Sequence, residues 1–233
     1  MTASPALGQK TDLSRSDKLS MLPTPGGLAW KVCRALARFV GSVFFPYFRV
    51  WGETELTRDG RIFITRNFGL LTWLTALRVF KRPVRVVVAD SGDDFCWFNL
   101  AGKCGLAPIF LNGTPEENFL LVEHLVEEGE KLLLVVPDFA DELSESLVSR
   151  LRAVRFLQVL FLAVAGAREA LPAKAFVPRV VPISAFCGMP HFQPGEDDSP
   201  LAELDFLEQA LTDLEIDELP SIFFNHQRNL NRT

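Results

Sequence analysis

Short apolar runs alternate with longer amphipathic segments along most of this chain, which predicts alternating strands and helices. The apolar runs predict strands at 48–51, 61–65, 84–89, 108–111, 131–136 and 179–184. The other segments predict helical structure at 28–50, 70–80, 96–102, 115–128, 143–171 (in one or two pieces) and 201–214. Because strands separated by helices form layered sheets, we expect an α/β fold, a single domain with a mixed, mostly parallel central sheet flanked by helices.

Turn and capping residues mark several boundaries of these elements. Arg58-Asp59-Gly60 predicts a turn between the first two strands. Thr114-Pro115-Glu116-Glu117 predicts a helix start with threonine as the N-cap, and Gly129 suits the left-handed cap that ends such a helix. The apolar run 156–167 is bracketed by arginines and is too short to cross a bilayer, so we interpret it as a core helix.

Length and composition fit one globular domain. The chain has 233 residues, of which 48% are hydrophobic and 23% charged, and its net charge is −5. This mild acidity argues against nucleic acid as the main partner. Lys and Arg are frequent in residues 1–90, whereas Asp and Glu dominate 196–218. We therefore expect a basic face near the N-terminus that suits anionic lipid or phosphate.

The sequence also bears on the cellular compartment. Residues 1–27 are polar and rich in Ser, Thr, Pro and Gly, which predicts a disordered lead rather than a signal peptide. No uncharged apolar run reaches the roughly 18 residues that a membrane span requires. Cys33, Cys96, Cys104 and Cys187 show no CxxC pairing, so we interpret them as reduced thiols and expect no metal site. We expect a cytoplasmic protein, peripheral on the inner face of the membrane.

The segment 28–50 has the composition of an interfacial membrane helix. Lys31, Arg34 and Arg38 recur at helical spacing, and Trp30 is among the residues that supply apolar area. An ordinary amphipathic helix packed on the domain explains the pattern equally well. The chain is thus divided into a lead 1–27, a membrane-facing helical segment 28–50, an α/β domain 51–218 and a tail 219–233.

The most informative stretch is Asn67-Phe68-Gly69-Leu70-Leu71-Thr72-Trp73, which follows the predicted strand 61–65. It is preceded by 48–60 and followed by Gly105–Asn112, by a helix–glycine–strand segment leading to Pro137-Asp138-Phe139, and by Val180-Val181-Pro182-Ile183. In order and spacing these blocks resemble the glycerolipid and lysophospholipid acyltransferase family over residues 28–188. The spacing is most similar to the acyltransferase half of bacterial 2-acylglycerophosphoethanolamine acyltransferase/acyl-carrier-protein synthetases.

The resemblance implies the acyltransferase scaffold without its catalytic pair. The family has Asn-His, then four residues, then Asp, and uses the histidine as general base on the lysolipid hydroxyl with the aspartate orienting it. This chain has Phe68 and Trp73 at those two positions. A phenyl ring accepts no proton, and an indole N–H only donates. Because a positioned acid–base group contributes about 10²–10⁴-fold, we expect little or no catalysis.

The blocks that bind substrate in the family are altered as well. Asn112 stands at or near the place where the family offers a cation to phosphate, and the family's Pro-Glu-Gly reads Pro137-Asp138-Phe139. The phenyl ring at 139 blocks the close approach that glycine permits. Arg66 is a candidate for residual anion binding. The aromatic replacements either form an apolar pocket for an acyl chain or fill an abandoned site as core residues.

No other residues supply a replacement catalytic plan. The sequence has no GxSxG, P-loop or GxGxxG motif. The basic cluster of Lys81, Arg82 and Arg85 fits a solvated charged loop. None of the three histidines stands at a spacing that requires a catalytic role: His124, His191 and His226.

Three functions remain open from the sequence. The favoured one is a catalytically inactive acyltransferase-fold protein that binds lipid or acyl chains, or regulates an active lipid enzyme or acyl carrier protein, at a membrane surface. The second is an active lysophospholipid acyltransferase with an atypical motif, with acyl-CoA or acyl-carrier protein as co-substrate and no other cofactor. The third is a soluble interaction protein that uses the acidic segment 196–218 as its contact surface.

Overall fold

Apolar runs of the sequence form the central sheet of the molecule. The computed structural model describes residues 27–45, 47–52, 61–89, 108–137, 142–154, 158–170, 179–188 and 201–213. Within these ranges a seven-stranded sheet has the order β1-β7-β6-β2-β5-β3-β4. The strands are β1 (Phe48–Trp51), β2 (Arg61–Arg66), β3 (Arg85–Val88), β4 (Ile109–Phe110), β5 (Leu132–Val136), β6 (Gln158–Ala165) and β7 (Ile183–Gly188).

The sheet is mixed and mostly parallel. Every neighbouring pair runs parallel except β6 and β7, which are antiparallel. Its central strands are buried on both faces: every residue of β5 is buried, as is every residue of β3. Strands of this kind have near-continuous apolar sequences because neither face meets water. The predicted α/β fold with a mixed sheet is therefore confirmed.

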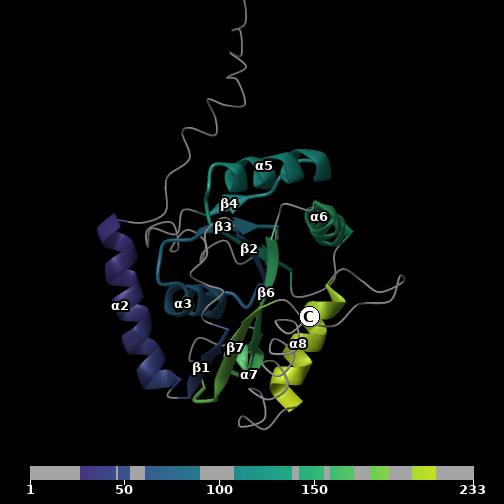
Figure 1. Cartoon of the computed structure of the whole chain (residues 1–233). Helices are drawn as coiled ribbons and strands as arrows, with labels where there is room; N and C mark the ends of the chain where they lie inside the picture. The colour runs from purple at the N-terminus through teal and green to yellow at the C-terminus, as the bar shows by residue number, and fades with distance from the viewer. Residues whose placement is uncertain are drawn as a thin grey trace, which may run out of the picture.

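Helices cover both faces of the sheet (Figure 1). Successive residues of β2 show the two layers, because Phe63 packs in the cluster that includes α2 and α3, whereas Ile62 and Ile64 pack in the cluster that includes α5, α6 and α8. The helices are α2 (Gly27–Phe44), α3 (Leu70–Val79), α5 (Pro115–Glu127), α6 (Glu142–Ala153), α7 (Ala167–Ala170) and α8 (Ala202–Asp213).

The N-terminal helix α2 is docked firmly on the domain. Its buried residues are Trp30, Ala37 and Gly41. At Gly41 a side chain would collide with the Arg78 guanidinium of α3. That guanidinium also lies over the Phe48 ring, 4.5 Å from its centroid. The absence of a side chain at Gly41 therefore lets the two helices approach each other closely.

The predicted start and end of helix α5 are confirmed. The Thr114 hydroxyl accepts a hydrogen bond from the Glu117 N–H at 3.3 Å, and the Glu117 carboxylate accepts one from the Thr114 N–H at 3.0 Å. This reciprocal pair satisfies two backbone donors at the helix start. Gly129 follows the helix with φ of 80°, a conformation that glycine adopts without strain.

The predicted helix 143–171 is wrong in its second half. Residues 142–153 form α6, but the apolar run that follows contains the strand β6, between β7 and β2 near the middle of the sheet. Residues 160–165 of this strand are all buried. An apolar run that is buried on both faces lacks a polar position in every turn, so its periodicity does not distinguish a strand from a buried helix.

Two further expectations about strands are corrected. The strand predicted at 179–184 begins only at Ile183, after the exposed Pro182, which has no N–H to donate to a ladder. The strands predicted on either side of the 58–60 turn are not neighbours, because β7 and β6 lie between β1 and β2. The helical segment predicted to reach residue 50 ends at Phe44, and β1 already belongs to the sheet.

Several predictions fall outside the described residues. They concern the lead up to residue 26, the turn 58–60, the helix 96–102, the tail 219–233, and the residues Asp138 and Phe139. Among the helices that the structure describes, none has the length and apolar character needed to cross a bilayer.

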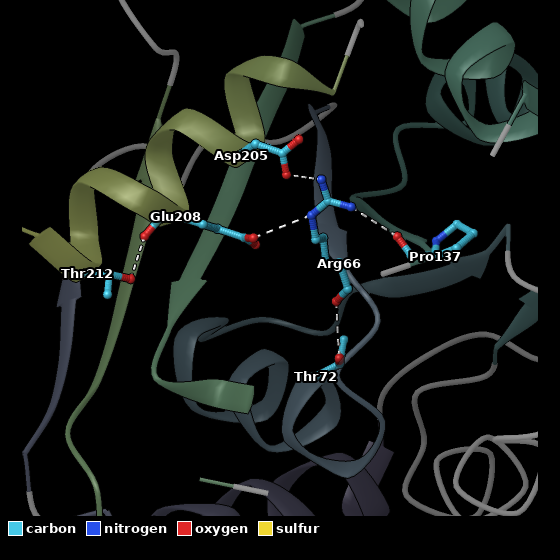
Figure 2. A network of polar contacts seen from close by, with 6 residues as sticks. All are labelled: Arg66, Thr72, Pro137, Asp205, Glu208 and Thr212. Atoms are coloured by element: carbon cyan, nitrogen blue, oxygen red, sulfur yellow. Dashed lines mark hydrogen bonds and ion pairs between the residues drawn. The ribbon is translucent and has the colours of Figure 1, made fainter. Parts of the chain in front are cut away.

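Arg66, the last residue of β2, connects the sheet to α8. Its side chain is 4% exposed and forms ion pairs with Asp205 and with Glu208, the latter at 3.4 Å between Nε and Oε2 (Figure 2). It also donates to the Pro137 carbonyl oxygen at 3.3 Å. A buried guanidinium requires such partners because an unpaired charge away from water is strongly disfavoured. The position of α8 thus depends on the charge at the end of β2.

We expect removal of the carboxylates to cost more stability than removal of the arginine. The double variant Asp205→Asn/Glu208→Gln removes two carboxylates that pair with a buried cation, and its free energy of unfolding should fall by about 3 kcal/mol. Arg66→Met should cost less, because methionine is apolar and the largely exposed Asp205 regains water. Urea denaturation measures both changes. The control Glu127→Gln/Asp213→Asn makes the same chemical changes at exposed positions, and a larger loss in Arg66→Met would contradict this role.

Candidate functional site

The first and third sequence blocks meet at one edge of the sheet. Arg66 and Val136 are paired in the parallel register of β2 and β5, and the next amide, Asn67 N–H, donates to the Val136 oxygen at 2.8 Å. Asn67 and Pro137, which follow the two strands, therefore lie side by side at this edge of the sheet. Asn112 follows β4, which is parallel to β3 at the end of the sheet. Ligands of open α/β sheets bind at this carboxyl edge.

Hydrogen bonds hold the loop after β2 in one conformation. The Asn67 side-chain oxygen accepts the Gly69 N–H at 2.9 Å. The Phe68 N–H donates to the Thr72 hydroxyl at 2.6 Å, and that hydroxyl donates to the Arg66 carbonyl at 3.2 Å. Gly69 has φ of 58° and ψ of −127°, so the chain turns sharply there into α3. Asn67 therefore has a structural role in this loop.

Phe68 and Trp73, which replace the expected catalytic pair, belong to the hydrophobic core. Trp73 is 3% exposed, and Phe68 packs, partly buried, against the same cluster on the α2–α3 face of the sheet. Neither side chain can accept a proton from a hydroxyl. The two positions at which the sequence resemblance implies the family's base and its orienting group are therefore part of the apolar packing.

The predicted substrate-binding residues are not brought into one cluster. Arg66 is engaged by the two α8 carboxylates, and anion binding there stays a prediction that would require competition with them. Asn112 is exposed and comes from β4, which is separated from β2 by β3 and β5. Asp138 and Phe139 lie just beyond the described end of the β5 segment.

Of the three histidines in the chain, the structure describes His124. His124 lies on α5, partly exposed, with its Nε2 3.2 Å from a Glu128 carboxylate oxygen, which fits the expected surface position. His191 and His226 lie outside the described residues. Across the described ranges, no cluster of three or more His, Cys, Asp or Glu side chains is arranged to hold a metal ion.

Helix α2 presents an apolar stripe to solvent. Its members recur every three or four residues and are all more than half exposed: Leu28 (77%), Val32 (56%), Leu36 (59%), Phe39 (68%) and Val43 (55%). We call these five residues the α2 stripe. Lys31 and Arg38 are exposed beside it, and Arg34 is partly buried. A solvent-facing row of large apolar side chains marks an interaction surface.

Trp30 does not belong to the α2 stripe. It was expected to face a membrane, but it is 3% exposed and points into the domain core. Leu28 and Val32 belong to the stripe but were not among the residues predicted to face a membrane. Their spacing of four residues, continued by Leu36, was the available signal, because positions i and i+4 share one helix face.

Comparison with known proteins identifies the fold. No protein-family model and no characterised protein matches this sequence significantly. The crystal structure of the 1-acyl-sn-glycerophosphate (LPA) acyltransferase PlsC from Thermotoga maritima is similar, with a TM-score of 0.52 over 80% of this chain and 80% of that chain at 11% sequence identity. This chain therefore has the fold of a glycerolipid acyltransferase, as its sequence blocks predicted.

Proposed function

We propose that this chain is an acyltransferase-fold protein of phospholipid metabolism that does not transfer acyl groups and instead binds membrane lipid. The burial of Trp73 in the core carries the proposal. Attack of a lysolipid hydroxyl on a thioester needs a base with a pKa near the working pH. With Phe68 and Trp73 both packed in one apolar cluster, the described part of the site offers no such group there.

The α2 stripe supports a peripheral position on the membrane. Five large apolar side chains face outward on a helix whose other face is anchored to the domain. An interfacial helix needs this division, with apolar side chains entering the boundary of the acyl layer and cations beside them at the phosphates. We place this contact on the inner face of the membrane, where anionic lipids attract basic segments.

The structure gives less support to α8 as an acidic contact surface. Three carboxylates of α8 are engaged within the chain: Asp205 and Glu208 pair with Arg66, and the nearly buried Glu203 pairs with Arg152 at 2.5 Å. Burial raises the pKa of Glu203, and Arg152 opposes this shift. These acids stabilise the fold of α8, which leaves fewer of them to bind a partner.

A turnover assay tests the absence of catalysis. We expect the purified protein to release no thiol above a protein-free blank when it is given lysophospholipid vesicles with acyl-CoA or with acyl-carrier protein. Asp138→Ala should leave this result unchanged. An active acyltransferase of the same fold serves as the positive control. Steady turnover that is lost in Asp138→Ala would instead establish the alternative, an active enzyme with an atypical motif.

Restoring the family's residues should damage the fold. Trp73→Asp removes a buried indole and buries a carboxylate, so we expect the free energy of unfolding to fall by at least about 3 kcal/mol. Phe68→His, at a partly buried position, should cost less. Urea denaturation followed by circular dichroism measures both. Phe206→His provides an exposed aromatic control on α8, 49% exposed. If Trp73→Asp is as stable as the parent chain, position 73 is not a core position.

Vesicle flotation tests the membrane contact. Leu36→Ser/Phe39→Ser removes two side chains from the α2 stripe, each contributing roughly 1 kcal/mol when half inserted, so binding should weaken about thirtyfold. Leu120→Ser/Phe206→Ser is the matched control, since these residues are exposed on α5 and α8. Equal losses in both double variants would show that the α2 stripe is not the membrane-binding face.

A further inference from the structure

A cationic groove lies between the N-terminal part of α2 and the turn that precedes β3. Its volume is about 640 Å³, within the range of sites that hold small ligands. Of the described residues that line it, half are cations and none is an acid. The lining consists of Gly27, Leu28, Trp30, Lys31, Arg34, Ala35, Arg38, Lys81, Arg82 and Pro83. We call it the α2 groove.

The three cations that α2 contributes to the groove are not neutralised by carboxylates among the described residues. Among the described residues, no carboxylate forms an ion pair with Lys31, Arg34 or Arg38. Burial lowers the pKa of Arg34, and the neighbouring charge of Arg38 lowers it further. The same two causes lower the pKa of Arg78, which packs behind α2. An anion in the groove would reduce this repulsion.

Two buried donors at the groove lack acceptors within the described structure. They are the indole Nε1–H of Trp30, a residue that is 3% exposed, and the Nε–H of Arg34. Buried polar groups in folded proteins are almost always hydrogen-bonded, because an unmade bond leaves the desolvation cost uncompensated. Both residues line the groove. A ligand rich in acceptor oxygens would match these donors.

The groove and the α2 stripe share a residue. Leu28 lines the groove and is also the first and most exposed member of the stripe. The cationic groove and the apolar stripe are therefore adjacent on the protein, just as the charged phosphate and the apolar acyl chains are adjacent in a phospholipid. Arginine suits this role because its planar guanidinium binds two phosphate oxygens at once.

We propose that the α2 groove binds the phosphate of an anionic phospholipid headgroup while the α2 stripe enters the acyl layer beside it. This inference rests on the proposed membrane function and specifies its ligand. Arg34 and Arg38 contact the phosphate, Lys31 lies beside them on the same helix, and Lys81 and Arg82 close the groove from the turn. The sequence predicted Lys81, Arg82 and Arg85 as a solvated basic loop. Arg85 is instead buried in β3 and pairs with Glu130, whereas Lys81 and Arg82 line the groove.

Sedimentation with vesicles of two compositions tests the proposal at constant ionic strength. One set contains only phosphatidylcholine, and the other also contains a fifth (~20%) of phosphatidic acid or phosphatidylglycerol. We expect the full chain to bind the anionic vesicles at least about tenfold more tightly than the neutral ones. Arg34→Gln/Arg38→Gln should remove most of this preference, whereas binding to neutral vesicles, which depends mainly on the α2 stripe, should fall by less. Circular dichroism of the free variant confirms that it is folded.

Controls separate the groove from general charge and from soluble phosphate. Arg49→Gln/Arg179→Gln removes two exposed arginines outside the groove and should keep the preference. An equal loss in both double variants, or equal binding of the parent chain to both vesicle types, overturns the proposal. A third outcome also overturns the proposal: inorganic phosphate raises the melting temperature in a way that depends on Arg34 and Arg38, but the parent chain shows no preference for anionic vesicles. The turnover assay and neutral-vesicle binding report on the proposed function separately.

Discussion

The parallel register between β2 and β5 determines where the first and third sequence blocks of the candidate site meet. Because Arg66 lies opposite Val136, the chain leaves both strands at one point, where the Asn67 N–H bonds to β5 and the Arg66 side chain reaches the Pro137 carbonyl across 71 residues of sequence. Beyond this point, side chains that are neighbours in the sequence pack on opposite faces of the sheet. Phe68 turns into the cluster below α2 and α3, while Arg66 holds α8 on the opposite face. A shift of this register by one residue would exchange these two environments.

Phe68 and Trp73 contribute to the stability of this acyltransferase-type fold and not to acid–base chemistry. An enzyme of this mechanism must keep a titratable base in a cleft and accept the desolvation that its pKa requires. Here Trp73 is buried at the corresponding position, and Phe68 covers the same cluster, so the region contributes apolar packing to the domain. The exposed chemistry lies elsewhere, on α2, where apolar and cationic side chains stand side by side. The proposed contact with lipid therefore does not involve Phe68 or Trp73.

Local sequence signals predicted those parts of the fold that local physics determines. The N-cap threonine at the start of α5 and the strand β5 were both predicted correctly, because the capping residues are specific and the apolar run before Pro137 is too short for a typical helix. The strand β6 was not, because burial on both faces removes the periodicity that separates strand from helix. The ion pairs of Arg66 with α8 were also out of reach, since 139 residues separate Arg66 from Asp205 and no short pattern links them. The inward direction of Trp30 depends on packing against α3, which the α2 sequence alone does not specify.

The packing of α2 at Gly41 bears on the proposed contact between this helix and a membrane. The Arg78 guanidinium fills the space beside this glycine, and Trp30 and Ala37 of α2 are buried in the same core cluster as α3. These contacts dock α2 on the domain along its length, so the proposed membrane contact through the α2 stripe would also orient the sheet and the other helices relative to the bilayer.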